Sequence, residues 1–183
     1  MRLFRARLGR YVATFEAVEA RLLSDLVDQV RTLLADRRSS VAPDPLADLT
    51  GMAVGPSTAP SDPAVARLLP DFSRDDAELS AGLRLIREPE VIAAKDAAAV
   101  ALLDSLPRGG GTVRLEERTA RSWLAALNDV RLAFGVRLGI TDDDTEPGAA
   151  TAEPDSPGYA MYVTYRWLSA MQESLVQAMM GAD

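Results

Sequence analysis

Hydrophobic side chains recur with helical spacing after Thr112 and predict the element around which the rest of the chain packs. Residues 112–115 alternate as in a short strand, and residues 116–138 follow with helical periodicity. At about 100° per residue, one face of this helix carries a continuous apolar stripe: Ala120, Trp123, Leu127, Val130, Phe134 and Leu138. Leu132 and Val136 project from nearly the opposite side. A helix with two apolar sides lies either at the centre of a bundle or in an oligomer contact.

The first fifteen residues alternate between apolar and polar positions and predict a β-hairpin. Phe4, Ala6 and Leu8 fall on one face of the first segment, and Arg5 and Arg7 fall on the other. Gly9-Arg10 fits a two-residue turn with glycine first, so we expect strands over about 3–8 and 11–15. Because an isolated hairpin is only marginally stable, we expect the 112–115 strand to join it, or the hairpin to lie on a helix.

Periodic apolar positions predict further helices on both sides of the central one. An amphipathic helix is expected over about 16–36, with Thr14 as its N-cap. The other helical segments are expected at 44–49, 63–69, 74–87, 89–105 and 159–180, with Ser73 as the N-cap of the 74–87 helix. In this interpretation Pro89 restarts the chain into a new helix. We therefore predict a mainly α protein, a helical bundle around the 116–138 helix with a small N-terminal sheet.

The length of 183 residues favours one domain over two. Residues 53–61 are rich in proline, serine and glycine and are typical of a flexible linker. Residues 141–157 combine a run of acids with glycine and prolines, so we expect a second loose segment there. The predicted organisation is a single domain over 1–183 with these two linkers.

Composition narrows the classes of function. Hydrophobic residues make up 48% of the chain, enough for a sizeable core, while the longest apolar runs fall short of a membrane span. The start of the chain does not resemble a signal peptide. The absence of cysteine excludes disulfides and thiolate nucleophiles, and the absence of histidine removes the commonest general base and metal ligand. A cytoplasmic location fits these features.

Charge is unevenly distributed along the chain. The net charge is −7, yet residues 1–40 carry eight arginines against five acids, and residues 141–183 carry one arginine against eight acids. Lys95 is the only lysine. Arginine suits pairing with carboxylates or phosphates, although a GC-rich genome also produces this bias.

Two motifs resemble ligand sites but have the wrong context. The glycines at 109–111 follow a helix and precede a strand, whereas a phosphate-binding loop needs the opposite order. Asp142, Asp143 and Asp144 are consecutive, whereas a calcium loop spaces its ligands around a glycine. We interpret the first motif as a turn and the second as a solvated charge run.

The remaining polar candidates are interpreted as structural. The acid pairs at 75–76 and 116–117 stand at helix starts, where acids favour the helix dipole. Asn128, Asp129 and Arg131 are expected to flank the apolar stripe and to pair with neighbouring elements. The Lys95 side chain is expected to lie along its helix with its ammonium reaching solvent. We therefore assign no catalytic, metal-binding or cofactor-binding residue.

The arginines of the hairpin form the basic patch of the chain and are the first candidate partner-binding residues: Arg2, Arg5, Arg7 and Arg10. A β-ribbon carrying arginines can enter a DNA groove. A nucleic-acid-binding domain is usually basic, however, and the pI here is about 4.7. Pairing with acidic loops or with an acidic protein partner is therefore favoured. The second candidate surface is the Leu132 and Val136 side of the central helix, which would also suit a homodimer.

Five segments together carry a resemblance to a known family. They are LGRYVATF (8–15), DPLADLTGM (44–52), LLPDFSRDDAE (68–78), LNDVRLAFGVRLGI (127–140) and YAMYVTYRWLSAMQESLV (159–176). They resemble an actinobacterial family known mainly as a domain of unknown function, with members described as transcriptional or oxidative-stress regulators. The similarity spans nearly the whole chain except the two linkers, and none of the segments is a catalytic motif.

The resemblance implies a role in stress physiology or proteostasis, because genes of this family typically neighbour the adaptor of the Clp protease and a cysteine-biosynthesis cluster. Some relatives are thought to sense oxidants through a closely spaced cysteine pair and to act with a sigma factor. This chain has no cysteine, so any redox role would run through methionine oxidation or through the partner.

The leading hypothesis is a non-enzymatic regulatory or adaptor protein that binds another protein. The resemblance implies a sigma factor, other transcription machinery or the Clp machinery as partner. A DNA-binding transcriptional regulator is the alternative, and an enzyme, with acids such as Glu117 or Asp129 converging in a concave site, is the third. We expect no cofactor and no membrane association.

Overall fold

The computed structural model describes residues 1–40, 55–140 and 156–181. These residues form five helices and three strands, which confirms the mainly α fold with a small sheet. In chain order the elements are β1 (Arg2–Arg7), β2 (Arg10–Phe15), α1 (Ala17–Ser39), α3 (Pro63–Leu68), α4 (Ala77–Ser105), β3 (Gly111–Leu115), α5 (Glu117–Arg137) and α6 (Pro157–Met180). The helix expected at 44–49 and nearly all of the linker expected at 141–157 lie outside the described residues.

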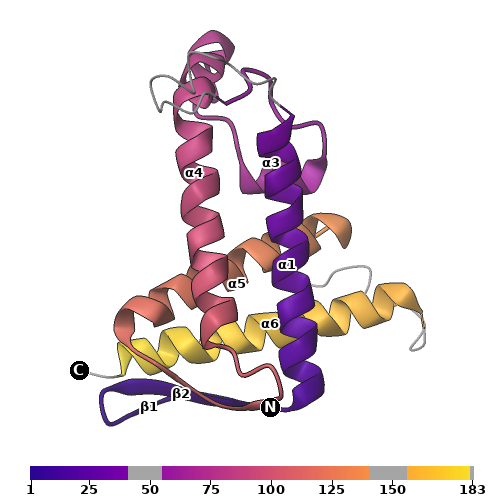
Figure 1. Ribbon diagram of the computed structural model, residues 1–183. Helices are drawn as coiled ribbons and strands as arrows, with labels where there is room; N and C mark the ends of the chain where they lie inside the picture. Colours follow the sequence, from indigo (N-terminus) through magenta and orange to yellow (C-terminus); the bar gives the residue numbers. More distant parts are fainter. Residues whose placement is uncertain (41–54, 141–155, 182–183) are drawn as a thin grey trace.

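The third strand joins the N-terminal hairpin, as expected. All neighbouring strands are antiparallel, in the order β1-β2-β3. The inner face of the sheet packs against the helices through aromatic rings, and the centroids of Phe4 and Phe15 lie 5.5 and 5.8 Å from that of Trp123. Figure 1 shows the sheet at the lower end of the molecule, where α1 begins and α4 ends. The sheet therefore closes one end of the helical bundle.

The hairpin turn lies one residue earlier than predicted. Leu8 and Gly9, with φ angles of 51° and 70°, connect the two strands. Two positive φ angles are typical of a type I′ turn, whose twist matches that of the flanking strands. The prediction of Gly9-Arg10 was wrong because the chain places a leucine in the left-handed region, which leucine rarely adopts.

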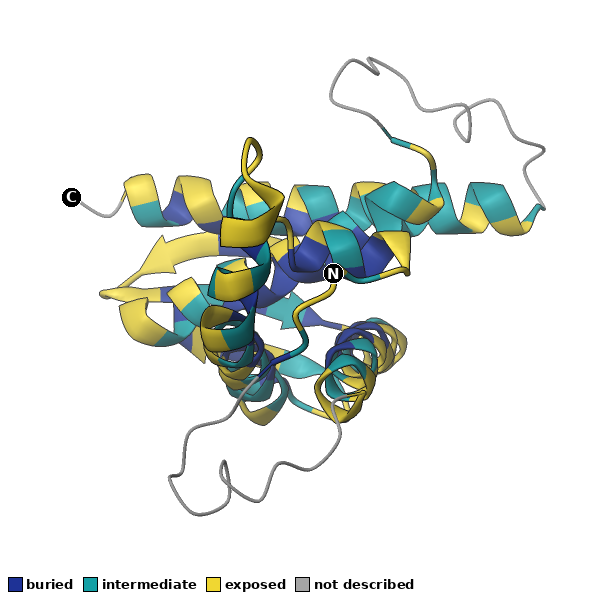
Figure 2. Cartoon of the chain, turned by 90° about the horizontal axis from the view of Figure 1, so that it is seen from above, coloured by how far each residue is buried: buried dark blue, intermediate teal, exposed yellow. Residues whose placement is uncertain are grey.

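α5 is the centre of the bundle, as its apolar stripe predicted. Ala120, Trp123, Leu127 and Val130 are almost completely buried. The helix packs against α1, α3, α4 and α6, and in Figure 1 it passes behind the upright pair of α1 and α4. Figure 2 shows buried positions where the helices face one another and exposed positions on their outer sides. The indole N–H of Trp123 donates to Ser105 Oγ at 2.8 Å, which satisfies its polar atom.

α4 runs without interruption through Pro89, whereas the sequence predicted two helices there. A proline inside a helix removes the N–H that would donate to the carbonyl four residues earlier, here that of Leu85. The backbone N–H of Gly55 donates to this oxygen instead, at 2.8 Å. A Cβ on Gly55 would lie 3.0 Å from the Pro89 ring, so glycine is the residue that fits. The predicted helix break at Pro89 is therefore wrong. The Gly55 N–H, which is distant in sequence, takes the place of the missing donor to the Leu85 carbonyl, so α4 continues.

Two helices begin later than their predicted caps. Thr14 remains in β2, paired with β3, and the N-cap of α1 is Glu16, whose N–H donates to Glu19 Oε2 at 2.8 Å. Asp76 caps α4 by accepting from the N–H of Leu79 at 2.8 Å. Ser73 accepts the N–H of Asp76 and belongs to the preceding turn. The N-cap therefore lies two residues later than predicted in α1 and three residues later than predicted in α4.

A buried ionic network joins α4 to α1. The side chain of Glu88 is 0% exposed and that of Arg84 is 1% exposed. One Glu88 oxygen accepts from Arg37 Nε at 2.7 Å, and the other accepts from Arg84 Nη1 at 2.7 Å. Arg84 also donates to Asp71 Oδ1 at 2.7 Å. One carboxylate thus serves two guanidinium groups and holds three segments together.

Candidate functional site

The outer face of the sheet gathers five arginines, which we call the arginine face: Arg2, Arg5, Arg7, Arg10 and Arg114. The strand register places Arg5 and Arg114 on either side of Val12, and Arg7 directly opposite Arg10. Side chains alternate across a strand, and a register shift in β1 between Arg2 and Arg5 brings Arg2 opposite Thr14, so all five residues point away from the aromatic cluster on the inner face. All four hairpin arginines predicted from the sequence therefore lie on one surface.

The positive charge of the arginine face is mostly uncompensated by the residues that the structure describes. Arg10 Nη1 lies 2.9 Å from Glu116 Oε1, and both side chains are largely exposed. None of the ion pairs in the described ranges involves the other four arginines of the face. Like charges directly opposite in a sheet destabilise it. An anionic partner would relieve this repulsion, and the described part of the fold does not.

Leu8, at the tip of the hairpin, is strained and exposed. A left-handed conformation costs a residue with a side chain roughly 1–2 kcal/mol relative to its ordinary conformations. The Leu8 side chain is 94% exposed, so it does not contribute to the core. Residues held in such conformations often serve a function. Leu8 is therefore part of the candidate site rather than of the stabilising framework.

The arginine face is hollowed rather than flat. The hollow has a volume of about 490 Å³, and Leu8 and Val12 supply its apolar walls between the arginines. Sequence reasoning missed Arg114 and Leu8. The alternation of residues 112–115 could have found Arg114, once that strand was placed beside the hairpin. Nothing in the sequence marks the left-handed conformation of Leu8.

The second predicted surface, at Leu132 and Val136, is half-buried within the same chain. Leu132 packs against the core cluster, and both residues line a small pocket of about 210 Å³ together with Arg131 and Tyr165. The Arg131 guanidinium lies 5.4 Å from the Tyr165 ring and donates to Ser169 Oγ at 2.9 Å. The two apolar sides of α5 thus reflect its central position, and a partner or homodimer surface at the half-buried Leu132 and Val136 stays a prediction.

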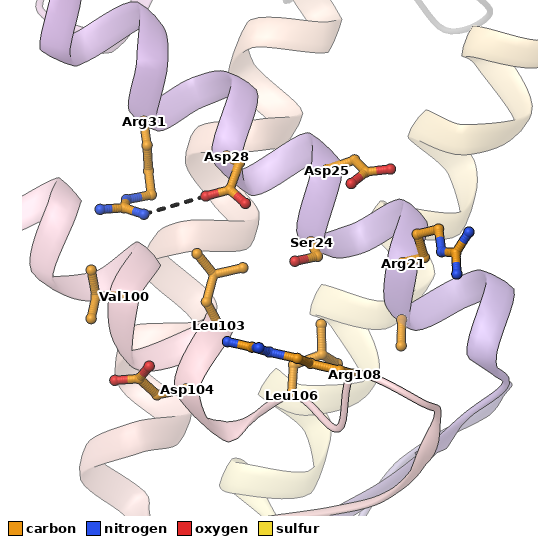
Figure 3. Close-up of a pocket in the computed structure, with 11 residues that line it drawn as sticks. Arg21, Ser24, Asp25, Asp28, Arg31, Val100, Leu103, Asp104, Leu106 and Arg108 are labelled. Atoms are coloured by element: carbon orange, nitrogen blue, oxygen red, sulfur yellow. Dashed lines mark hydrogen bonds and ion pairs between the residues drawn. The ribbon is translucent and has the colours of Figure 1, made fainter.

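Another hollow, of about 550 Å³, lies between α1 and the end of α4 (Figure 3). Leu103 and Leu106 form apolar parts of its lining, and Arg108 extends across it. Arg31 is paired with Asp28 at 3.3 Å, as the dashed line in Figure 3 marks. Three arginines and three aspartates line the hollow, so its formal charges cancel. This balance gives no preference for an anion or a cation.

The single lysine is part of an ion pair inside the bundle. Lys95 Nζ lies 2.6 Å from Oδ1 of Asp129, and the Asp129 side chain is buried. Burial raises the pKa of Asp129, and the Lys95 ammonium partly opposes this shift. Lys95 therefore pairs with α5 instead of only extending to solvent. Asp129 has the structural role that the sequence indicated, as a partner of a neighbouring element.

The other polar candidates stay apart from one another. Glu117 forms an exposed pair with Arg121 one turn along the same helix. Glu117 and Asp129 are twelve positions apart in α5, which corresponds to about 18 Å along the axis, so these acids do not converge. The expected turn before β3 is closed by a hydrogen bond from the Gly110 N–H to the Pro107 carbonyl at 2.9 Å, and Gly111 is the first residue of the strand. The aspartates at 142–144 lie outside the described residues.

Within 1–40, 55–140 and 156–181, no three acidic side chains lie close enough together to hold a metal ion. In the same ranges, no helix combines the length and the apolar character that a membrane span requires.

The fold and its surface define a mainly helical protein that presents one strongly basic sheet face. A family model described as "Domain of unknown function (DUF2017)" matches residues 1–179, and the chain belongs to this family. The chain is 39% identical over 188 residues to proteins named "Oxidative stress regulator AosR" from Mycobacterium tuberculosis and Mycobacterium bovis. Each alignment covers 94% of this chain and 84% of the relative. No solved structure matches the chain significantly.

Proposed function

We propose that this chain is a non-enzymatic regulatory protein of the stress response that acts by binding another protein through the arginine face. The names of its mycobacterial relatives support the regulatory role. The observation that carries the mode of action is the concentration of five arginines on one side of the sheet, four of them without an acidic partner in the described residues.

The expected partner is acidic where it meets the sheet. Arginine forks bind carboxylates through two parallel hydrogen bonds, so an ordered set of arginines gives both attraction and orientation. Complementary charge mainly raises the rate and specificity of association. A sigma factor, another part of the transcription machinery or a component of the Clp machinery is the partner class that we propose.

Affinity capture from the native host's lysate tests this function. The bait is the full chain, and the comparison is with the double variant Arg5→Glu and Arg114→Glu, which reverses charge on two strands of the face. Arg38→Glu is the matched control, because Arg38 is exposed near the end of α1. A helix of 23 residues is about 34 Å long, so this control lies far from the sheet.

The expected result is a partner that copurifies with the wild type and with Arg38→Glu but is lost with the double variant. Equal recovery with all three proteins would contradict the assignment of the arginine face. Recovery of DNA without any protein, with affinity that falls steeply as salt rises, would instead support the alternative of a DNA-binding regulator.

A further inference from the structure

Leu8 works against the stability of the hairpin that contains it. Its φ of 51° lies in the region that glycine and asparagine adopt more readily, and its side chain is 94% exposed. Asparagine followed by glycine is the usual pair in such a turn, whereas this chain has leucine followed by Gly9. Folding does not explain a leucine at this position, because the side chain is not in the core.

The position of Leu8 relates it to the arginine face. The residue lies between Arg7 and Arg10, and it lines the same hollow as Val12. The hollow therefore has an apolar part bordered by guanidinium groups. Such a surface has affinity for a ligand with one apolar group flanked by negative charges.

We propose that Leu8 and Val12 receive an apolar side chain from an acidic protein segment, whose carboxylates pair with the arginine face. The proposal rests on the proposed function and adds the chemistry of the partner: a short segment with a central apolar residue between acidic ones. Arg5 and Arg114 stand on the two sides of Val12. Carboxylates on both sides of the central residue can therefore each meet a guanidinium.

The size of the hollow favours a short segment. Its volume of about 490 Å³ accommodates a few side chains. The whole chain has a net charge of −7 although this face carries five arginines, so the rest of the chain has a net charge of −12. A long polyanion that extends beyond the face would be repelled by this net negative charge, whereas a short segment that stays on the face would be repelled less.

The aromatic residues of the sheet argue against single-stranded nucleic acid. Proteins that bind such strands stack the bases on exposed aromatic side chains. The sheet's own rings, those of Phe4, Tyr11 and Phe15, are buried on its inner face. On the arginine face the apolar side chains are the aliphatic ones of Leu8 and Val12, which suit contact with an apolar side chain of a protein.

Two fluorescently labelled peptides test the proposal directly on the full chain. Both are short and acidic, and they differ only at the central residue, which is leucine in one and serine in the other. Binding is measured by fluorescence anisotropy at constant ionic strength, because charge pairing depends on salt. We expect the wild type to bind the leucine peptide about five- to tenfold more tightly than the serine peptide, as expected for partial burial of one leucine.

The variant Leu8→Asn removes the apolar contact with the peptide without weakening the hairpin turn. Asparagine tolerates the left-handed region, so we expect the melting temperature to rise by about 2–4 °C. The preference for the leucine peptide should fall below about twofold, because the apolar wall is lost. Ile86→Gln is the matched control, since Ile86 is 63% exposed in the first half of α4, whereas the sheet lies where this helix ends (Figure 1). It should change neither the preference nor the turn.

Each contrary outcome has a distinct meaning. Equal binding of the two peptides to the wild type, or an unchanged preference in Leu8→Asn, overturns the apolar subsite but leaves protein capture by the arginine face intact. Tighter binding of an oligonucleotide of equal charge overturns the proposal in favour of nucleic acid. Absence of binding to either peptide, while a protein is still captured through Arg5 and Arg114, shows that the partner is recognised by other chemistry and also overturns it.

Discussion

Replacement of Glu88 by glutamine should strongly destabilise the protein. Glutamine has nearly the same shape as glutamate, but it carries no charge and keeps a single acceptor oxygen. In the structure both Glu88 oxygens accept charged hydrogen bonds, from Arg37 and Arg84. The variant would leave the Arg84 guanidinium, which is 1% exposed, without the carboxylate it faces inside the protein.

Removal of one member of a buried ion pair typically costs about 3–5 kcal/mol, because the other charge remains desolvated. The total stability of a domain is about 5–15 kcal/mol, so the loss is a large fraction of it. At roughly 2–4 °C per kcal/mol for a chain of this size, the melting temperature should fall by about 6–20 °C. Asp71 offsets part of the Arg84 charge, which favours the lower half of this range.

Thermal and urea denaturation followed by circular dichroism would measure the effect. The control is Glu117→Gln, which breaks an exposed pair with Arg121 and should stay within about 0.5 kcal/mol of the wild type. The double variant Arg84→Met and Glu88→Leu should be less destabilised than Glu88→Gln, because it removes the Arg84 charge that the single variant leaves buried without a carboxylate, while Arg37 loses its partner in both variants. A loss below about 1 kcal/mol for Glu88→Gln would refute the assumption that this carboxylate neutralises buried charge.

Three further predictions concern single positions. Gly55→Ala should cost about 1–3 kcal/mol, because its Cβ would lie 3.0 Å from Pro89 and displace the donor of the Leu85 carbonyl; faster hydrogen exchange at residue 55 would accompany the lower melting temperature. Gly110→Ala should lower the melting temperature as well, because its Cβ would lie 2.6 Å from the backbone nitrogen of Ala17; an unchanged value would contradict the close approach. Lys95→Met should destabilise the protein more at pH 7 than at pH 4, as unfolding at both pH values would show. Burial raises the pKa of Asp129 in the folded state above the unfolded value of about 3.9, so this group's contribution to stability is present at low pH and is lost as pH rises through the raised pKa. In Lys95→Met the ionised carboxylate of Asp129 has no counterion, so the loss of stability is larger at pH 7. Equal losses of unfolding free energy at pH 4 and pH 7 would contradict this linkage.

The amino-acid sequence determined the helices and their inward faces. The stripe of α5 from Ala120 to Val130 is buried as its spacing predicted, because helical periodicity is a local property and burial of an apolar stripe follows from it. The same reasoning predicted the hairpin and its partner strand from their alternation and from the weakness of an isolated hairpin. Four of the five arginines of the candidate site were identified from the sequence because they lie in one hairpin, but alternation alone would place Arg2 and Arg5 on opposite faces, and only the register shift in β1 brings them together.

Tertiary structure decided the features that depend on groups far apart in the chain. Local chemistry favours a helix break at Pro89, but Gly55 supplies the missing hydrogen bond and α4 continues. Arg114 enters the arginine face only because β3 pairs with β2 across about a hundred residues of sequence. The left-handed conformation of Leu8 follows from the twist of the paired strands rather than from any preference of leucine. A sequence specifies local periodicity directly, whereas the hydrogen bonds, ion pairs and strand register that assemble a surface exist only once distant segments have packed together.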